Sequence, residues 1–400
     1  MNLPFEDALG FLYPRTTGGA KWSLDPTRLL LARLGHPETH YACVHIGGTN
    51  GKGSVATLVA EALGAAGRRV GLYTSPHLVD IRERMLVDGR PISREAFATW
   101  TAELRTTVLE VGASFFEATT AIALADFAAR GVDIAVIEVG LGGRLDATNV
   151  VDPLVSAVTH IGLDHADYLG DSLEGIAREK AGIAKRGRPF VIGEADPALR
   201  AVLVQAAEAA GALPIVVDAA ARYPGTLRLA GPHQRRNAAV ARGVLEALPR
   251  DWRPTEDVLT RAFARASISG RMERRGAWLF DVAHNPSGVA VLVEGLRLDP
   301  VPQPVHALVG ILADKDWRTM IDGIGTVAQR IWVTIAPSAP PERVWSLAAV
   351  AEAFPQVTVE RDFDRALRLV HEGAGTTLVT GSFHTVGDAM ARLPGFAPLG

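Results

Sequence analysis

Residues 43–54 constrain this chain more than any other stretch, because an apolar run stops there at two glycines and a helix-compatible run follows. Tyr41 to Ile46 predicts a buried strand, and residues 54–66 predict a helix. A strand, a glycine-rich turn and a helix together point backbone N–H groups and the positive end of a helix dipole at a bound phosphate. Lys52 would add a positive charge, and Thr49 or Ser54 a hydroxyl for Mg²⁺.

The turn departs from the strict P-loop pattern G-x-x-x-x-G-K-[ST]. That pattern would need glycine where Ile46 stands and Ser or Thr where Gly53 stands. A plain glycine turn in an α/β protein is therefore the alternative interpretation. Lys52 and the flanking strand and helix favour a phosphate loop.

Composition narrows the class of protein. Four hundred residues exceed the usual size of one hydrophobic core, so two domains are expected. A net charge of −3 without a basic run argues against nucleic-acid binding. Cys43 is the single cysteine, which excludes an intramolecular disulfide and favours a reducing, cytoplasmic location. The first ten residues lack a basic region typical of a signal peptide, and no uncharged apolar run approaches the roughly 18 residues of a membrane span.

Alternating strand and helix signals predict parallel sheets in two α/β domains. Polar residues 267–275 suggest a junction near residue 268. The clearest strand is Asp133 to Val139, and Glu138 interrupts its apolar run at the carboxyl end, where ligands bind in open α/β sheets. A carboxylate there is placed to hold Mg²⁺, although a solvent-facing glutamate is the alternative. A further strand, 155–161, leads to His165, which would reach the same edge of the sheet.

The segment Gly48-Thr49-Asn50-Gly51-Lys52-Gly53-Ser54 resembles the phosphate loop of the Mur ligase superfamily, ATP-dependent enzymes that join an amino acid to a carboxylate. From His45 to Met390 the chain is similar to the folylpolyglutamate synthase/dihydrofolate synthase family. The resemblance implies an ATP-binding P-loop domain over residues 1–268, with a mostly parallel sheet flanked by helices. It also implies a smaller Rossmann-like α/β domain that binds glutamate over residues 269–400.

The reaction that the resemblance implies needs activation of a carboxylate by ATP, through an acyl phosphate that an amine attacks. Phosphoryl transfer of this kind needs a phosphate cradle and metal ions more than covalent help from the protein. We expect two Mg²⁺ sites. Matching the family's motifs position by position gives the metal ligands Ser54, Ser75, Glu138, His165 and a carbamylated Lys180, with Lys52, Lys180 and His284 catalytic. The nucleotide would also contact Asn237, Arg271 and Asp281.

The same resemblance places the substrates, which we expect to be dihydropteroate, reduced folates and L-glutamate. The residues it assigns to them are Thr74, Ser75, Pro76, His77, Arg82, Phe116, Arg144, Asp146, Ala147, His284 and Ser382. The loop Gly143 to Asn149 is more similar to the bacterial bifunctional enzymes than to those that only polyglutamylate. A strand-end loop tied down by Asp146 and Asn149 would account for much of the same pattern.

Three other functions stay open from the sequence. A polyglutamylation-only folate enzyme would use the same residues. A Mur-type cell-wall ligase should carry an additional N-terminal domain, whereas about forty residues precede the first strand here. A regulator that uses ATP as a switch would have no need of a second substrate site, which Asp281 and His284 indicate. We expect a monomer that does not associate with membranes.

Overall fold

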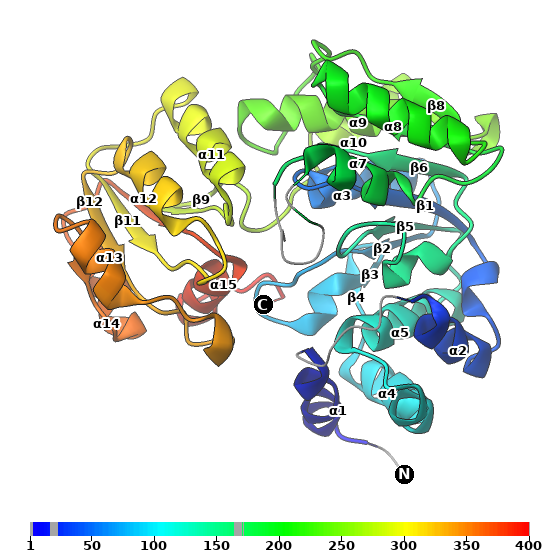
Figure 1. Cartoon of the computed structure of the whole chain (residues 1–400), viewed down its shortest axis with the longest axis horizontal. Helices are drawn as coiled ribbons and strands as arrows, with labels where there is room; N and C mark the ends of the chain where they lie inside the picture. Colours follow the sequence, from blue (N-terminus) through cyan, green and yellow to red (C-terminus); the bar gives the residue numbers. More distant parts are fainter. Residues whose placement is uncertain (1–2, 17–22, 164–169, 171, 400) are drawn as a thin grey trace. The chain divides into compact units, whose positions relative to one another are not determined.

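A computed structural model of the chain describes residues 3–16, 23–163, 170 and 172–399 (Figure 1). Contacts divide the chain into two units. Unit 1 comprises residues 1–75, 84–226 and 236–266, and unit 2 comprises residues 76–83, 227–235 and 267–400. Each unit is an α/β structure built on one sheet, which confirms the predicted fold class. Among the described residues, no helix is long and apolar enough to cross a membrane.

The sheet of unit 1 has eight strands in the part of the chain that the structure describes. Its strands, in spatial order, are β4 (Arg90–Pro91), β3 (Met85–Val87), β2 (Val70–Tyr73), β5 (Ile134–Glu138), β1 (Ala42–Gly47), β6 (Val155–Val158), β7 (Pro189–Ile192) and β8 (Leu213–Val216). Strands β2 to β8 of that order pair in parallel, and β3 and β4 pair antiparallel at one edge. The carboxyl ends of β5, β1, β6 and β7 therefore meet at one edge of the sheet.

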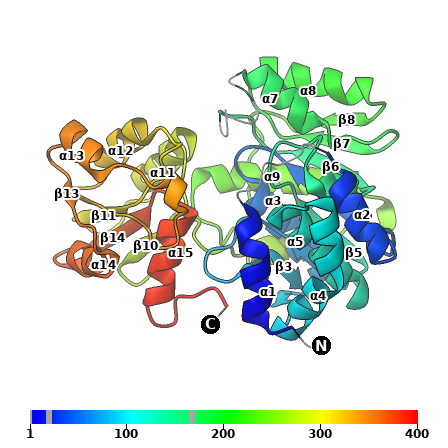
Figure 2. The same ribbon diagram turned by 60° about the horizontal axis from the view of Figure 1, so that its bottom comes forward.

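Helices cover both faces of this sheet because its central strands are apolar on both sides. Phe190 of β7 packs into a cluster with α7 and α8, and the next residue, Val191, faces α9. The helices of unit 1 are α1 (Phe5–Leu12), α2 (Asp25–Arg33), α3 (Lys52–Ala65), α4 (Arg94–Val111), α5 (Phe115–Ala129), α7 (Leu173–Ala181), α8 (Pro197–Ala209), α9 (Pro232–Ala247) and α10 (Glu256–Phe263). The first four residues of α9 count with unit 2. Helices α1, α4 and α5 are clearest in Figure 2.

Unit 2 has a six-stranded sheet among the described residues, with the order β13-β12-β11-β14-β10-β9. All neighbours pair in parallel except β9, which is antiparallel to β10. The elements are β9 (Glu273–Arg275), β10 (Trp278–Phe280), α11 (Pro286–Leu298), β11 (Val305–Val309), α12 (Trp317–Gly325), β12 (Arg330–Val333), α13 (Leu347–Ala353), β13 (Thr358–Val359), α14 (Phe363–His371), β14 (Thr376–Thr380) and α15 (Phe383–Arg392).

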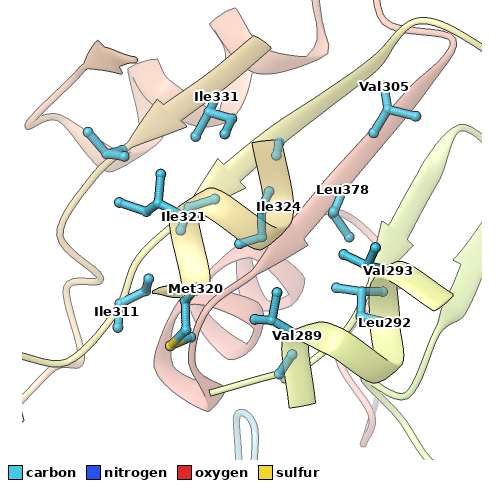
Figure 3. Packing of buried hydrophobic residues seen from close by; sticks show 14 of the residues in the cluster. Val289, Leu292, Val293, Val305, Ile311, Met320, Ile321, Ile324, Ile331 and Leu378 are labelled. Atoms are coloured by element: carbon cyan, nitrogen blue, oxygen red, sulfur yellow. The ribbon is translucent and has the colours of Figure 1, made fainter. Parts of the chain in front are cut away.

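An apolar core supports that sheet from both sides. On one face, α11 and α12 bring Val289, Leu292 and Met320 against Val305 of β11 and Leu378 of β14 (Figure 3). On the other face, α14 and α15 pack over Phe280 and Leu308. The ends of β10 and β14 are thereby held side by side, and they carry the residues that sequence analysis assigned to this half of the chain.

Candidate functional site

The glycine-rich turn after β1 has a backbone that only glycine adopts readily. Gly48 has φ +138° and Gly51 has φ +86°, and α3 begins at the next residue, Lys52. A β-carbon on Gly48 would overlap the hydroxyl of Thr159, and one on Gly51 would lie 2.6 Å from Asn237 Oδ1. The first backbone N–H groups of α3 have no side-chain cap in this turn. The turn is therefore an open cradle for an anion at the start of a helix.

The residues that follow β6 hold this cradle in place by hydrogen bonds. The backbone N–H of Thr49 donates to His160 O over 2.6 Å, and the hydroxyl of Thr159 donates to Asn50 O over 2.7 Å. The Thr49 hydroxyl in turn donates to Gly162 O over 3.1 Å. Because the Thr49 hydroxyl is engaged with main chain, Ser54, buried in the first turn of α3, is the better placed of the two hydroxyls for a metal.

Two lysines reach the carbonyls of the cradle. Lys52 Nζ donates to Thr49 O, and Lys180 Nζ, on α7, donates to Gly48 O, each over 3.0 Å. Lys180 is only 4% exposed. The fold thus brings a residue from 132 positions further along the chain to the phosphate loop. Sequence reasoning had placed both lysines at this site, and carbamylation of Lys180 stays a prediction.

Glu138 and Ser75 lie together at the carboxyl edge of the same sheet. Glu138 ends β5 and is 4% exposed, and its Oε2 accepts the backbone N–H of Ser75, which follows β2, over 3.1 Å. Carboxylate and hydroxyl oxygens are hard ligands that suit Mg²⁺. Among the described residues no group of three or more His, Cys, Asp or Glu side chains could hold a metal. His165 lies outside the described residues.

Buried hydrogen bonds organise the loop after β5. Asp146, at the start of the short helix η4 (Ala147–Val150), accepts the N–H groups of Leu141 and Thr148 over 2.8 and 2.9 Å and also the Thr148 hydroxyl. Burial raises the pKa of the Asp146 carboxyl, although these hydrogen bonds lower it. Thr148 also contacts Nε2 of the buried His45 on β1, over 2.8 Å, a link that sequence analysis missed. The described contacts of Asp146 are therefore structural, and its contact with a substrate stays a prediction.

The other residues expected at the substrate end lie near this loop or in the segment after β2. A β-carbon on Gly140 would contact the ring of Phe116, and Ala147 is buried. Arg144 is exposed and pairs with Glu179 over 3.1 Å. The predicted segment 74–82 is divided, because Thr74 and Ser75 belong to unit 1 while Pro76, His77 and Arg82 belong to unit 2.

Within unit 2, the predicted residues converge where β10 and β14 end. Asp281 accepts the N–H groups of Met272 and Ala283, each over 2.9 Å. Burial raises the pKa of Asp281, although the nearby Arg271 guanidinium lowers it. Arg271 stands 5.3 Å from the centre of the Phe383 ring, and the His284 ring is 5.5 Å from the same centre.

Ser382 and Asn237 complete the predicted set. Ser382 caps the N-terminus of α15 by accepting the N–H of Thr385 over 3.1 Å, so its hydroxyl lies beside Phe383 at the end of β14. Asn237, on α9, belongs instead to unit 1, where it lies against Gly51 of the phosphate loop. The phosphate-loop residues and Glu138 therefore gather at the carboxyl edge of the sheet of unit 1, and Asp281, His284 and Ser382 at the carboxyl edge of the sheet of unit 2.

Comparison with known proteins identifies the family. Residues 46–218 match the Mur ligase middle domain, and residues 270–383 match the glutamate ligase domain of Mur ligases. The dihydrofolate synthase/folylpolyglutamate synthase of Bacillus subtilis is 31% identical over 98% of this chain and 100% of its own length. The chain belongs to the folylpolyglutamate synthase/dihydrofolate synthase family.

Other members of the family differ in length or have been solved with ligands. A probable bifunctional folylpolyglutamate synthase/dihydropteroate synthase of Haloferax volcanii is 34% identical over 97% of this chain, but the chain spans only 50% of its length. Escherichia coli FolC in complex with DHPP and ADP matches with a TM-score of 0.87 and 31% identity, over 97% of both chains. A bifunctional folylpolyglutamate synthase/dihydrofolate synthase with Mn, AMPPNP and L-glutamate bound matches with a TM-score of 0.84 and 31% identity, over 97% of both chains.

Proposed function

We propose that this chain is an ATP-dependent ligase that adds L-glutamate to dihydropteroate and to reduced folates. The observation that carries the proposal is the convergence of Lys52 and the buried Lys180 on the glycine turn. At the same edge of the sheet, Glu138 and Ser75 supply oxygen ligands from the ends of the neighbouring strands β5 and β2. Phosphoryl transfer to a carboxylate requires such a phosphate cradle, positive charge beside it and oxygen ligands for the metal ions.

Residues 48–54 would hold the ATP phosphates, and Lys52 would neutralise charge on the transferred group. Ser54, Ser75, Glu138, His165 and carbamylated Lys180 would hold two Mg²⁺ ions, which neutralise phosphate charge during the transfer. An unmodified ammonium of Lys180 would repel a divalent cation, whereas a carbamate is an oxygen ligand of the right sign. With its carboxylate activated as an acyl phosphate, the substrate is attacked by the amine of glutamate, and ADP and phosphate are released.

The proposal assigns residues 1–268 to ATP and the pteroate ligand and residues 269–400 to glutamate. Asn237 would meet the adenosine from the side of the phosphate loop. In unit 2, Arg271 would reach the phosphates, Asp281 the nucleotide, and His284 and Ser382 the incoming glutamate. The pteroate ligand would lie against 74–82, Phe116 and the loop with Arg144, Asp146 and Ala147.

Dual activity is proposed because a relative that this chain matches over its full length carries both names. The ligands of the solved relatives, DHPP in one and L-glutamate in another, support both halves of the reaction. Use of ATP and a buried free Cys43 favour a cytoplasmic location, and we propose that the enzyme acts as a monomer.

A substrate panel tests the function. The purified chain is given MgATP and glutamate with dihydropteroate, tetrahydrofolate or a muramoyl nucleotide, and ADP release is measured. We expect ADP release that depends on glutamate with the first two substrates and none with the third. Release with tetrahydrofolate alone would narrow the function to polyglutamylation. Release with the muramoyl nucleotide alone would refute the proposal.

A further inference from the structure

A histidine and a buried glutamate form a pair at the carboxyl edge of unit 1 that the roles above leave unused. His160 follows β6, and Glu194 follows β7, the neighbouring strand. His160 Nδ1 lies 3.1 Å from Glu194 Oε2, and the two side chains are 47% and 2% exposed. The buried carboxylate of Glu194 thus contacts one nitrogen of the His160 ring, and that ring is still partly exposed to solvent.

Glu194 is fixed in its ionised form. Its Oε2 also accepts the N–H of Ile161 over 2.6 Å, and its Oε1 accepts the N–H of Asp196 over 2.8 Å. Burial on its own would raise the pKa of Glu194, but the bonds from His160 and from the two backbone groups outweigh it and lower that pKa. An ionised carboxylate only accepts hydrogen bonds, so Nδ1 of His160 carries the hydrogen. When Nε2 also carries a hydrogen, both nitrogens of the ring are hydrogen-bond donors.

The backbone of His160 contacts the phosphate loop, and its ring borders Gly162, which the loop also contacts. The His160 carbonyl accepts the N–H of Thr49 over 2.6 Å. A β-carbon placed on Gly162 would lie 3.5 Å from His160 Nε2 and 3.7 Å from Thr49 Cγ2, so this nitrogen and Thr49 border the same glycine. His160 Nε2 therefore lies beside Gly162, whose carbonyl accepts the Thr49 hydroxyl of the cradle.

We propose that His160, held by Glu194, is a further contact for the phosphate oxygens of the bound nucleotide. This inference rests on the proposed function and adds a residue to the same site. A carbamylated Lys180 would be an anion, leaving Lys52 as the cation among the two lysines at the turn, so a further donor beside the turn would add to the binding of phosphate oxygens. Other charged groups on the surrounding elements are Lys52, Lys180, Arg236, whose Nη2 donates to Gly193 O, and the carboxylates of Glu194 and Asp196.

Calorimetric binding of AMPPNP with Mg²⁺ tests the inference without relying on turnover. His160→Asn should weaken binding about tenfold, the effect of losing a charge-assisted hydrogen bond at a half-exposed site. His160→Lys keeps a nitrogen donor and should bind within about threefold of the parent chain. His36 offers a matched control, because its Nδ1 also lies 3.1 Å from a glutamate oxygen, that of Glu38. Unlike His160, His36 precedes β1 and does not follow a strand. His36→Asn should leave affinity unchanged.

Glu194 is a positioning residue in this scheme, and its effect should pass through His160. Glu194→Gln should weaken AMPPNP binding in the parent chain but cause no further loss in the His160→Asn background. Parent-like affinity of His160→Asn, with a parent-like thermal midpoint, would overturn the inference, and so would an equal loss from Glu194→Gln in both backgrounds. Failure of the parent chain itself to bind AMPPNP would instead overturn the proposed function.

Discussion

Two glycines at opposite ends of α3 allow a controlled test of the phosphate loop. Gly51 precedes the helix and Gly67 follows it, and both have φ +86°. Alanine in this left-handed region costs about 1–2 kcal/mol, so each Gly→Ala change should lower stability by a similar amount. The two sites differ in space. A β-carbon on Gly67 meets no atom within 4 Å, whereas one on Gly51 lies 2.6 Å from Asn237 Oδ1.

Gly51→Ala therefore requires a shift of Asn237 or of the turn itself, and Gly67→Ala does not. We expect the thermal unfolding midpoint to fall in both variants, and at least as far in Gly51→Ala as in Gly67→Ala. Calorimetry should show at least about a tenfold loss of AMPPNP affinity in Gly51→Ala, or about 1.4 kcal/mol, and an unchanged affinity in Gly67→Ala. Equal affinity in the two variants would refute the view that the turn before Lys52 is the nucleotide cradle.

Three further predictions concern single side chains. Lys52→Ala should lower ADP release by about 100-fold or more, with an unchanged thermal midpoint, because a charge facing the transferred phosphate is lost. Protein incubated with ¹³C-bicarbonate should give a carbamate NMR signal that Lys180→Ala lacks, and added acetate should restore part of that variant's activity. Burial lowers the pKa of His45 from 6.5 to about 3, so the unfolded chain binds the proton more tightly and stability falls as pH drops from about 6.5 toward 3. Urea titrations should therefore show about 2 kcal/mol less stability at pH 5 than at pH 7 from this group, a loss absent in His45→Asn.

Strands buried on both faces were the elements that the sequence predicted best. The apolar runs at 41–46 and 133–139 correspond to β1 and β5, because a parallel strand between two helical layers is apolar on both sides. The sequence did not indicate β3, β4 or β9, which are short antiparallel strands at sheet edges with polar residues among them. β4 and β9 have no apolar run, and the apolar run of β3, Met85–Val87, is only three residues long, too short to predict a strand.

Apolar residues at helical spacing run through 93–130 in the sequence without a visible interruption. The structure ends α4 at Gly112, in the left-handed conformation with φ +67°, and starts α5 with a capping box in which Ser114 and Glu117 satisfy each other's backbone N–H groups. Both signals, a glycine and an S-x-x-E pattern, are present in the sequence. Helical periodicity continues through the break and conceals it.

Site residues fall into two groups by how they could be found. Motif residues such as Lys52 and Glu138 stand beside glycines or at strand ends, where their local context indicates a role. His45, Thr159 and Glu194 could not be found in this way, because their importance arises from contacts between neighbouring strand ends. Those contacts can be predicted only when the order of β1, β6 and β7 in the sheet is known.

The central claim is that the pteroate carboxylate is activated by phosphorylation before glutamate attacks it. An isotope measurement tests this directly. Dihydropteroate labelled with ¹⁸O in both carboxylate oxygens is converted with unlabelled ATP, Mg²⁺ and glutamate, and the released phosphate is analysed by mass spectrometry. Formation of an acyl phosphate places one carboxylate oxygen in the bond to phosphorus, so one ¹⁸O should appear in each phosphate and one should remain in the new amide. Phosphate without ¹⁸O, in the presence of a glutamylated product, would contradict the account.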